Sequence, residues 1–213
     1  MVRIPFFKRL LSYIYSIKVD ESEGDKGAKL YLYRNQFVLS TDETTYSNGH
    51  KYQPAIAIAN DLKTFLPSVN NVLVLGTGLG SIVSVFHRSG FHPNFTLVEK
   101  DKTILQWATE IFEADRVAGI QPVYADALGY MEQNHEKYDL IFVDIFDSRV
   151  VPDFVTSKHF LKLCYKSLTP SGHFVVNYMI NDQSAWEKVK QLFTDVFRNH
   201  RVLKFGENRI LVV

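Results

Sequence analysis

The sequence predicts an α/β protein with a doubly wound, mostly parallel sheet, and three observations lead to this fold class. Apolar runs alternate with amphipathic stretches across residues 71–199, a pattern typical of parallel strands joined by crossover helices. Three glycines, Gly76, Gly78 and Gly80, follow the first apolar run. Two β-rich stretches in residues 201–213 flank a Gly-Glu-Asn turn, so we expect a terminal hairpin that adds an antiparallel strand.

The N-terminus is predicted to be an amphipathic helix within residues 1–18. Its apolar residues fall on one helical face, which contains Phe6, Phe7, Leu10, Leu11, Ile14 and Ile17. A cleavage pattern of small residues is missing, which argues against a secretory signal. Three interpretations of this face stay open: packing on the chain's own domain, packing on a sister subunit, and contact with a membrane surface.

The segments that follow are predicted to form an appendage in front of the main domain. Polar, glycine-bearing stretches predict linkers, and prolines bound the first long helix. In chain order we expect a linker at 19–28, hairpin strands at 30–33 and 37–39, a loop at 41–52, and a helix at 55–65 between Pro54 and Pro67. We therefore divide the chain into an N-terminal helix with a β-hairpin, 1–53, and a ligand-binding domain, 54–213.

The main domain is predicted to alternate strands and helices. Strands are expected at 72–75, 95–99, 121–124, 139–144 and 173–178. Helices are expected at 81–89, 101–113, 127–134, 157–168 and 183–199. Together with the two terminal stretches, these strands make a sheet of seven.

The composition limits the kinds of partner and location that we expect for the chain. A net charge of +1 gives no broad basic surface, so no nucleic-acid partner is expected. The single cysteine, Cys164, excludes an internal disulfide and favours a reducing, cytoplasmic location, and its apolar surroundings predict a buried structural thiol. No apolar run reaches the roughly 18 residues that a transmembrane helix needs.

The three glycines predict a cofactor site. Glycines after a buried strand let the backbone turn sharply and approach a ligand, and the helix that begins near Ser81 offers free N–H groups. Gly76, Gly78 and Gly80 are therefore expected to bind a nucleotide-like cofactor. The third glycine comes one residue earlier than in the dinucleotide pattern G-x-G-x-x-G.

Acidic residues follow the predicted strands, at the edge where ligands of open α/β sheets bind. Glu99 comes nineteen residues after Gly80, a spacing that suits a carboxylate bound to the two hydroxyls of a ribose. Asp126 can accept a hydrogen bond from an adenine amino group, cap the helix that begins at Ala127, or do both.

A second pair of acids, Asp144 and Asp147, follows the strand at 139–144. Two acids at this position can hold a cationic amine and remove its proton, or they can serve turn and capping chemistry. The histidines do not cluster, so no metal site is expected, and no serine lies in the Gly-x-Ser-x-Gly setting of an esterase.

Several of these motifs together resemble the AdoMet-dependent methyltransferase domain, and more narrowly its spermidine synthase branch. The resemblance covers roughly residues 30–180, and it is carried by the glycine loop, Glu99, and the stretches 42–46, 125–127, 137–147 and 157–172. It implies a Rossmann-like sheet and S-adenosyl-L-methionine, or decarboxylated S-adenosylmethionine, as cofactor. It also implies a small-molecule acceptor, for which an amine is one candidate, and a homodimer.

The resemblance also implies roles for individual residues. Glu99 would bind the ribose, Asp126 with Ala127 the adenine, and Asp144 would be the base or the acid that orients the amine. The remaining roles go to Asp147 and Tyr46, which would line the acceptor pocket, and to Gln53 or Gln36, which would reach the cofactor.

Departures from the branch shape the expected reaction. The family's loop aspartate, which faces the transferred aminopropyl group, is replaced by Leu79, and apolar Ile145 and Phe146 separate the two acids. We therefore expect methyl transfer to a small acceptor, with Asp144 as base. The alternatives are an aminopropyltransferase of polyamine biosynthesis, a non-catalytic binding or scaffold protein, and, with less support, an NAD-dependent dehydrogenase.

Overall fold

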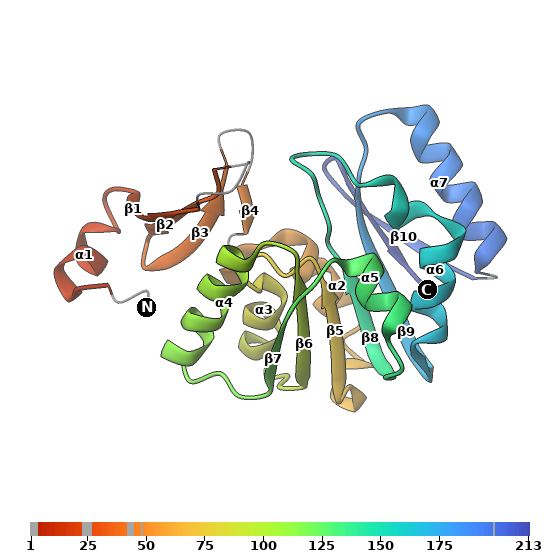
Figure 1. The fold of residues 1–213 in the computed structure, drawn as a ribbon, viewed down its shortest axis with the longest axis horizontal. Helices are drawn as coiled ribbons and strands as arrows, with labels where there is room; N and C mark the ends of the chain where they lie inside the picture. Colours follow the sequence, from red (N-terminus) through yellow and green to blue (C-terminus); the bar gives the residue numbers. More distant parts are fainter. Residues whose placement is uncertain (1–3, 23–26, 42–44, 48, 198) are drawn as a thin grey trace.

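The computed structural model describes residues 4–22, 27–41, 45–47, 49–197 and 199–213. The described residues form two sheets, a four-stranded N-terminal sheet and a seven-stranded main sheet (Figure 1). The strands are β1 (Ile17–Glu21), β2 (Lys29–Tyr33), β3 (Gln36–Ser40), β4 (Thr45–Ser47), β5 (Asn71–Leu75), β6 (Asn94–Glu99), β7 (Ile120–Tyr124), β8 (Tyr138–Val143), β9 (Leu168–Met179), β10 (Arg201–Phe205) and β11 (Asn208–Val212).

Seven α-helices connect and cover these strands within the described residues. They are α1 (Phe6–Leu11), α2 (Gln53–Asp61), α3 (Ser81–Arg88), α4 (Lys102–Ala114), α5 (Ala127–Gln133), α6 (Lys158–Lys166) and α7 (Gln183–Val196). Short 3-10 helices lie at Gly49–Lys51, Leu66–Ser68 and Asp153–Thr156.

The main sheet has the strand order β10-β11-β9-β8-β5-β6-β7. Strands β5 to β9 pair in parallel, whereas β11 is antiparallel to β9 and to β10. Both the doubly wound sheet and the antiparallel terminal strand are as predicted. The order reverses between β5 and β8, and this switch point is where open α/β sheets bind ligands.

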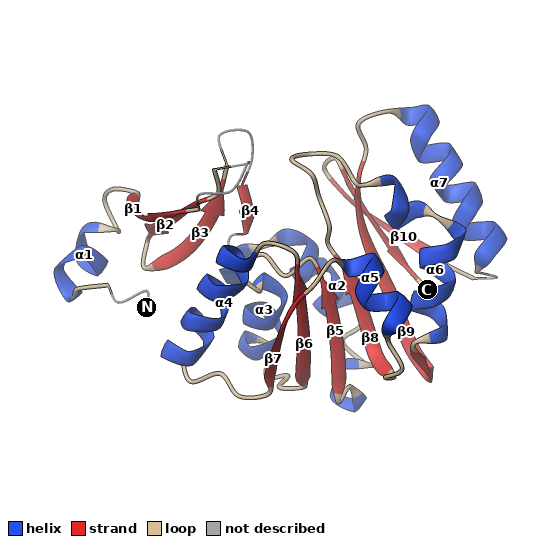
Figure 2. Ribbon diagram, viewed as in Figure 1, coloured by secondary structure: helices blue, strands red, loops and turns tan. Residues whose placement is uncertain are grey.

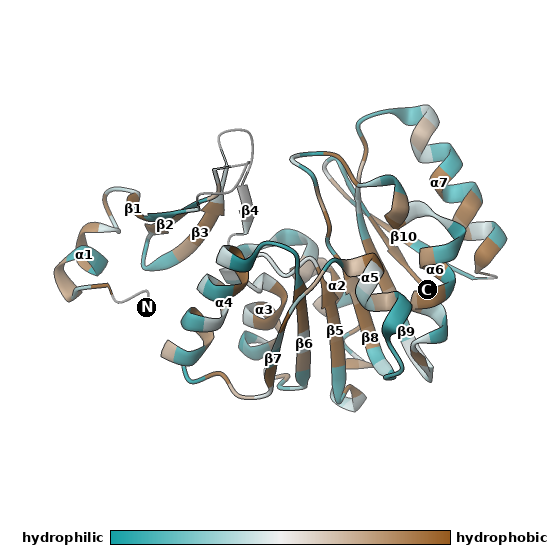
Figure 3. Cartoon of the chain, in the orientation of Figure 1, coloured by the Kyte–Doolittle hydropathy of each residue, from teal (hydrophilic) through white to brown (hydrophobic). Residues whose placement is uncertain are grey.

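Helices cover both faces of the main sheet (Figure 2). One core packs α2, α3 and α4 against the sheet, with Ile58, Phe86 and Phe112 among its buried side chains. The opposite core packs α5, α6 and α7, with Phe160 and Phe193. Figure 3 shows hydrophobic residues along the central strands, as expected for strands that are buried on both faces.

The N-terminal sheet packs on the main domain through an apolar cluster. Ala28, Leu30 and Leu39 from this sheet lie against Leu79 of the glycine loop and Trp107 of α4. The indole N–H of Trp107 also donates to Asp20 Oδ2 over 2.9 Å, and the hydroxyls of Ser47 and Ser81 lie 2.5 Å apart. The sheet is therefore fixed to the loop that opens the ligand site.

Three predictions for the N-terminal part are wrong in detail. The first helix ends at Leu11, and Ile17 begins β1, so residues 17–21 of the expected helix and linker form a strand. Ile17 fits two patterns: it lies three residues after Ile14, as on a helical face, and it begins the apolar–polar–apolar alternation of a strand with Lys18 and Val19. Pairing with β2 selects the strand. The expected loop at 41–52 contains β4 and a 3-10 helix.

The apolar face of the first helix does not pack on its own domain. None of the residues of α1 is buried, and Phe6 is 76% exposed. That interpretation of residues 1–18 is therefore wrong, and the two other interpretations remain. Among the described residues, no helix has both the length and the apolar character needed to cross a bilayer.

The two largest differences from the predicted boundaries in the main domain concern β9 and α2. Strand β9 begins at Leu168 and not at residue 173, because Leu168 pairs with Tyr138 ahead of a register shift in the ladder. The helix expected at 55–65 is Gln53–Asp61, followed by a 3-10 turn at Leu66–Ser68. The division of the chain at residues 53 and 54 stays a prediction.

Candidate active site

A cavity of about 440 Å³ opens at the carboxyl ends of the central strands. It lies at the switch point between β5 and β8, and the N-terminal sheet contributes Ala28, Leu39 and Thr41 to its wall. The acids that line it, within the described part of the chain, are Glu99, Asp101, Asp126 and Asp144. The carboxyl ends of parallel strands meet at one edge, which explains why acids far apart in the sequence share this cavity.

Gly76, the first glycine, lies where the backbone of the glycine loop passes close to the backbone of Asp144. Gly76 has φ +84°, and a Cβ there would collide with the carbonyl of Asp144. The collision follows from the register, because Leu75 pairs with Val143 and the two chains leave the sheet side by side. Only glycine satisfies both the backbone conformation and the space at this position.

The other two glycines have different surroundings. Gly78 lines the cavity, whereas a Cβ at Gly80 would overlap the ring of Phe112 in α4. Gly80 adopts φ +71° as the N-cap of α3 and is not among the described residues that line the cavity. The structure thus places Gly76 and Gly78 at the predicted site and gives Gly80 a packing role.

Glu99 ends β6 and is anchored by backbone donors. The N–H of Gly78 donates to Oε2 over 3.1 Å, and the N–H of Asp101 donates to Oε1 over 3.1 Å. Burial raises the pKa of this carboxyl, and these backbone hydrogen bonds oppose the rise. Each oxygen keeps a second lone pair, so the carboxylate can also accept hydrogen bonds from two neighbouring hydroxyls.

Asp126 caps α5 from the rim of the cavity. Its Oδ1 accepts the N–H groups of Leu128 at 3.0 Å and Gly129 at 3.1 Å. The capping role is therefore present, and Ala127 beside it also lines the cavity. An adenine contact stays a prediction, and Oδ2 is the oxygen that would make it.

Asp144 lies at the centre of a hydrogen-bonded cluster beside the glycine loop. Its Oδ1 accepts the hydroxyl of Tyr52 over 3.0 Å and the side-chain amide of Asn177 over 2.9 Å. Asn177 in turn accepts an amide hydrogen bond from Asn208 over 2.8 Å. Oδ2 accepts no hydrogen bond from the described residues, which leaves this oxygen for a ligand in the cavity.

The environment sets the proton affinity of this cluster. Burial raises the pKa of Asp144 to about 6, although the hydrogen bonds from Asn177 and Tyr52 lower it in part. Burial also raises the pKa of the Tyr52 hydroxyl well above its ordinary value, and the charge of Asp144 adds to the effect. Asp144 is therefore the group that changes protonation near neutral pH, while Tyr52 stays protonated.

The sequence interpretation missed Tyr52, Asn177 and Asn208. A usable signal existed for Asn177, because a polar residue that interrupts a buried apolar strand needs a specific partner. Tyr52 precedes α2, and its approach to Asp144 depends on how that helix packs, so local sequence carries no comparable signal.

Three other predicted residues stand apart from this cluster. Asp147 is exposed, forms a backbone bridge with Val150, and is not among the described residues that line the cavity. Gln53 is exposed at the start of α2, and the side-chain amide of Gln36 contacts the ring of His50. The side chain of Tyr46 lies outside the described residues.

Two further features limit the chemistry of the site. Leu79 points into the apolar cluster under the N-terminal sheet and not into the cavity. Among the described residues, no group of three His, Cys, Asp or Glu side chains is arranged to hold a metal ion. The cavity thus offers carboxylates, backbone N–H groups and apolar walls.

Comparisons with known proteins identify the family. Residues 52–205 match the model of the spermine/spermidine synthase domain. A protein of Bifidobacterium longum named "Probable polyamine aminopropyl transferase" is 32% identical over 139 residues, which cover 64% of this chain and 31% of that protein. A polyamine aminopropyltransferase of Clostridium beijerinckii is 28% identical over 144 residues, which cover 64% of this chain and 51% of the relative.

A solved structure agrees at the level of the fold. A protein of Corynebacterium glutamicum described as "a probable spermidine synthase" superposes with a TM-score of 0.77 at 20% identity, over 91% of this chain and 78% of that one. The chain spans a third to a half of the two curated relatives, 31% and 51% of their lengths. The family match covers the glycine loop, Glu99, Asp126 and the Tyr52–Asp144–Asn177 cluster, and on this basis the chain belongs to the spermine/spermidine synthase family.

Proposed function

We propose that this chain is an aminopropyltransferase that takes decarboxylated S-adenosylmethionine as donor and a small amine as acceptor. The observation that carries the proposal is the Asp144 carboxylate, which has one oxygen held by Tyr52 and Asn177 and the other available to the cavity. The curated relatives are named for this transfer, which favours it over the methyl transfer expected from the sequence.

The donor site would combine the glycine loop with two acids. Glu99 would accept the ribose hydroxyls, and Asp126 with Ala127 would lie beside the adenine. Gly76 and Gly78 would bring the backbone close to the sulfonium end of the donor. The proposal gives the loop a contact role only, because Leu79 offers no charge to the donor.

The reaction needs a positioned amine and a base. The acceptor nitrogen would attack the carbon of the aminopropyl group that is bonded to sulfur, the carbon–sulfur bond would break, and methylthioadenosine would leave. Asp144 Oδ2 would receive the proton that the amine loses. Alignment contributes up to about 7–11 kcal/mol to such transfers, and a positioned base adds roughly 10²–10⁴-fold.

Several predictions accompany this proposal. Asp147 and Tyr46 as residues of the acceptor pocket, Gln53 or Gln36 as cofactor contacts, and Gly80 as a cofactor residue stay predictions. The homodimer, the cytoplasmic location and the domain boundary after residue 53 also stay predictions.

A binding and turnover experiment tests the proposal. Calorimetry compares decarboxylated S-adenosylmethionine, S-adenosylmethionine and methylthioadenosine, and mass spectrometry then follows product formation with putrescine and other amines. We expect preferred binding of the decarboxylated donor and release of methylthioadenosine. Release of S-adenosylhomocysteine instead would restore the methyltransferase interpretation, and binding without turnover would support a non-catalytic protein.

A further inference from the structure

The N-terminal segment exposes an unusual density of apolar side chains. Seven of the ten residues from 6 to 15 are large, apolar or aromatic, and 44–76% exposed: Phe6, Phe7, Leu10, Leu11, Tyr13, Ile14 and Tyr15. We call them the N-terminal apolar surface. The large exposed apolar residues of the described main domain, such as Tyr124 and Phe205, occur singly, which is ordinary for a protein surface. A contiguous patch instead indicates a binding surface.

Polar contacts hold this surface outward. Ser12, which is fully buried, accepts the N–H of Asn35 at its hydroxyl over 2.9 Å and the N–H of Arg34 at its carbonyl over 2.7 Å. The guanidinium of Arg9 donates to Asn35 Oδ1 over 2.8 Å. The segment thus turns its polar side toward the β2–β3 turn and its apolar side chains toward solvent, the reverse of an ordinary amphipathic helix on its own core.

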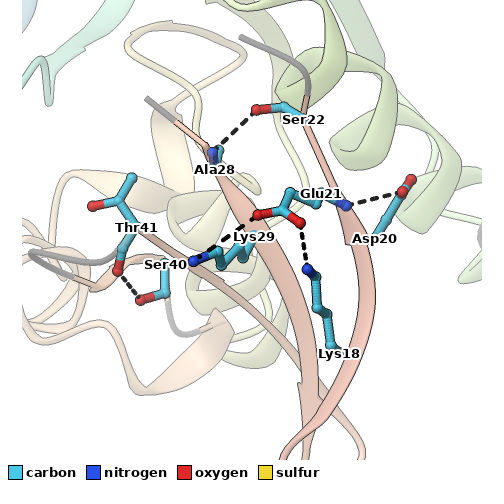
Figure 4. A network of polar contacts seen from close by, with 8 residues as sticks. All are labelled: Lys18, Asp20, Glu21, Ser22, Ala28, Lys29, Ser40 and Thr41. Atoms are coloured by element: carbon cyan, nitrogen blue, oxygen red, sulfur yellow. Dashed lines mark hydrogen bonds and ion pairs between the residues drawn. The ribbon is translucent and has the colours of Figure 1, made fainter. Parts of the chain in front are cut away.

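The segment that carries the surface is basic, although Lys8 lines a hollow together with Asp20 and Glu110. Residues 4–18 and 27–41 contain three lysines and two arginines but no Asp or Glu. Glu21 pairs with Lys18 of its own strand, β1, and with Lys29 of the neighbouring strand, β2 (Figure 4). No carboxylate of the described residues forms an ion pair with the remaining cations, which are Lys8, Arg9 and Arg34.

We propose that the N-terminal apolar surface docks on an anionic lipid bilayer. Aromatic and aliphatic side chains would enter the boundary between headgroups and acyl chains, and the three cations would lie against lipid phosphates. Charge distinguishes this occupant from a second copy of the chain, because a twofold contact repeats one patch on both sides and would bring like cations together. The inference does not depend on the proposed transferase activity.

The position of the surface gives docking a consequence for the ligand site. α1 lies at the outer end of the N-terminal sheet, away from the main sheet (Figure 1). The same sheet supplies Leu39 and Thr41 to the wall of the cavity. One small sheet therefore carries the bilayer surface and part of the ligand site.

Vesicle co-sedimentation of the full chain tests the proposal. We expect binding to vesicles of phosphatidylcholine with phosphatidylglycerol, weaker binding as salt rises, and little binding to phosphatidylcholine alone. The double variant Phe7→Ser/Ile14→Ser should lose at least about tenfold in partitioning. Lys8→Glu replaces attraction by repulsion and should lose about fivefold or more.

A matched control variant, Tyr124→Ser/Phe205→Ser, removes two exposed aromatic rings from other parts of the surface. It should bind vesicles like the wild type, and thermal unfolding should show that all variants are folded. Light scattering reports the mass in solution in parallel. A wild-type dimer that ignores vesicles and that Phe7→Ser/Ile14→Ser makes monomeric would overturn the proposal in favour of a second copy. Equal binding to neutral and anionic vesicles, or no binding by a monomer, would overturn it as well.

Discussion

Asn177 Nδ2 donates a hydrogen bond to Asp144 Oδ1 over 2.9 Å, across the boundary between two adjoining segments of the main sheet. Asn177 lies in β9, and Asp144 follows directly after β8. The pair therefore orients the carboxylate from the sheet itself, and the other oxygen is left to meet a ligand. This relationship makes the role of Asp144 testable through its neighbour as well as directly.

The substitution Asp144→Asn removes the base that the proposed transfer needs. We expect kcat to fall roughly 10²–10⁴-fold while affinity for the donor changes little, because Glu99 and the glycine loop would hold the donor. Steady-state kinetics and calorimetry measure the two effects separately. Asp115→Asn, at an exposed acid after α4, should leave both values unchanged. A loss of donor affinity equal to the loss of rate would contradict the base role.

Activity should rise with pH through the pKa of Asp144, about 6, since only the ionised carboxylate can take a proton. Asn177→Leu removes a donor that favours the ionised form, so the acid limb of the rate profile should move to higher pH. A hydrogen bond to a charged group contributes about 1.5–3 kcal/mol, which corresponds to roughly one to two pH units.

Two companion variants separate proton affinity from packing. Tyr52→Phe removes the other donor to Oδ1 and should move the acid limb in the same direction. Asn208 hydrogen-bonds Asn177 and makes no hydrogen bond to Asp144, so Asn208→Ala should move the acid limb less. A lower rate at every pH with an unmoved limb would mean that Asn177 serves packing alone.

The same carboxyl should make the folded protein less stable as pH rises toward neutrality. Burial raises the pKa of Asp144 to about 6, so the folded chain binds a proton more tightly than the unfolded chain does. Between the two pKa values stability falls with rising pH, by on the order of 3 kcal/mol in total. Urea unfolding should therefore show that the free energy of unfolding of Asp144→Asn, relative to that of the wild type, increases from acid to neutral pH. A difference that does not change across this window would contradict the burial of a charged carboxylate.

Glu99→Gln tests the donor site. The amide removes the negative charge and one acceptor, so affinity for methylthioadenosine should fall about tenfold to a hundredfold, as expected for one hydrogen bond to a charged group. Calorimetry measures the change. Glu113→Gln alters an exposed glutamate in α4 and should bind normally. Unchanged binding by Glu99→Gln would remove the ribose role.

Gly76→Ala should destabilise the protein more than Gly90→Ala does. Both glycines have nearly the same φ, +84° and +85°, so an alanine costs roughly 1–2 kcal/mol at either position from backbone conformation alone. A Cβ at Gly76 also collides with the Asp144 carbonyl, whereas nothing lies near the one at Gly90. Chemical denaturation measures the difference, and equal losses would show that the loop relaxes without cost.

The main domain could be predicted from the sequence because its strands are buried on both faces. The apolar runs at 72–75 and 139–144 match β5 and β8 to within a residue at either end. Glu99 and Asp144 share a cavity because the carboxyl ends of parallel strands share an edge. These features follow from local pattern and general topology.

The remaining features depend on contacts between distant segments. Ile17 belongs to a strand only because β2 is there to pair with it. Tyr52 reaches Asp144 across 92 positions of the chain, and Asn177 reaches it from the adjoining strand across 33. No local pattern encodes such distances, so the hydrogen-bonded partners of Asp144 emerge only once the sheet is assembled.

Leu79 links the chemistry of the glycine loop to the packing of the N-terminal sheet. Its side chain is wedged among Leu30, Leu39 and Trp107, where the N-terminal sheet meets the glycine loop. A carboxylate introduced there would be buried against hydrocarbon, and its desolvation would favour separation of the N-terminal sheet from the glycine loop. A charged residue at this position and a closely packed N-terminal sheet therefore exclude each other.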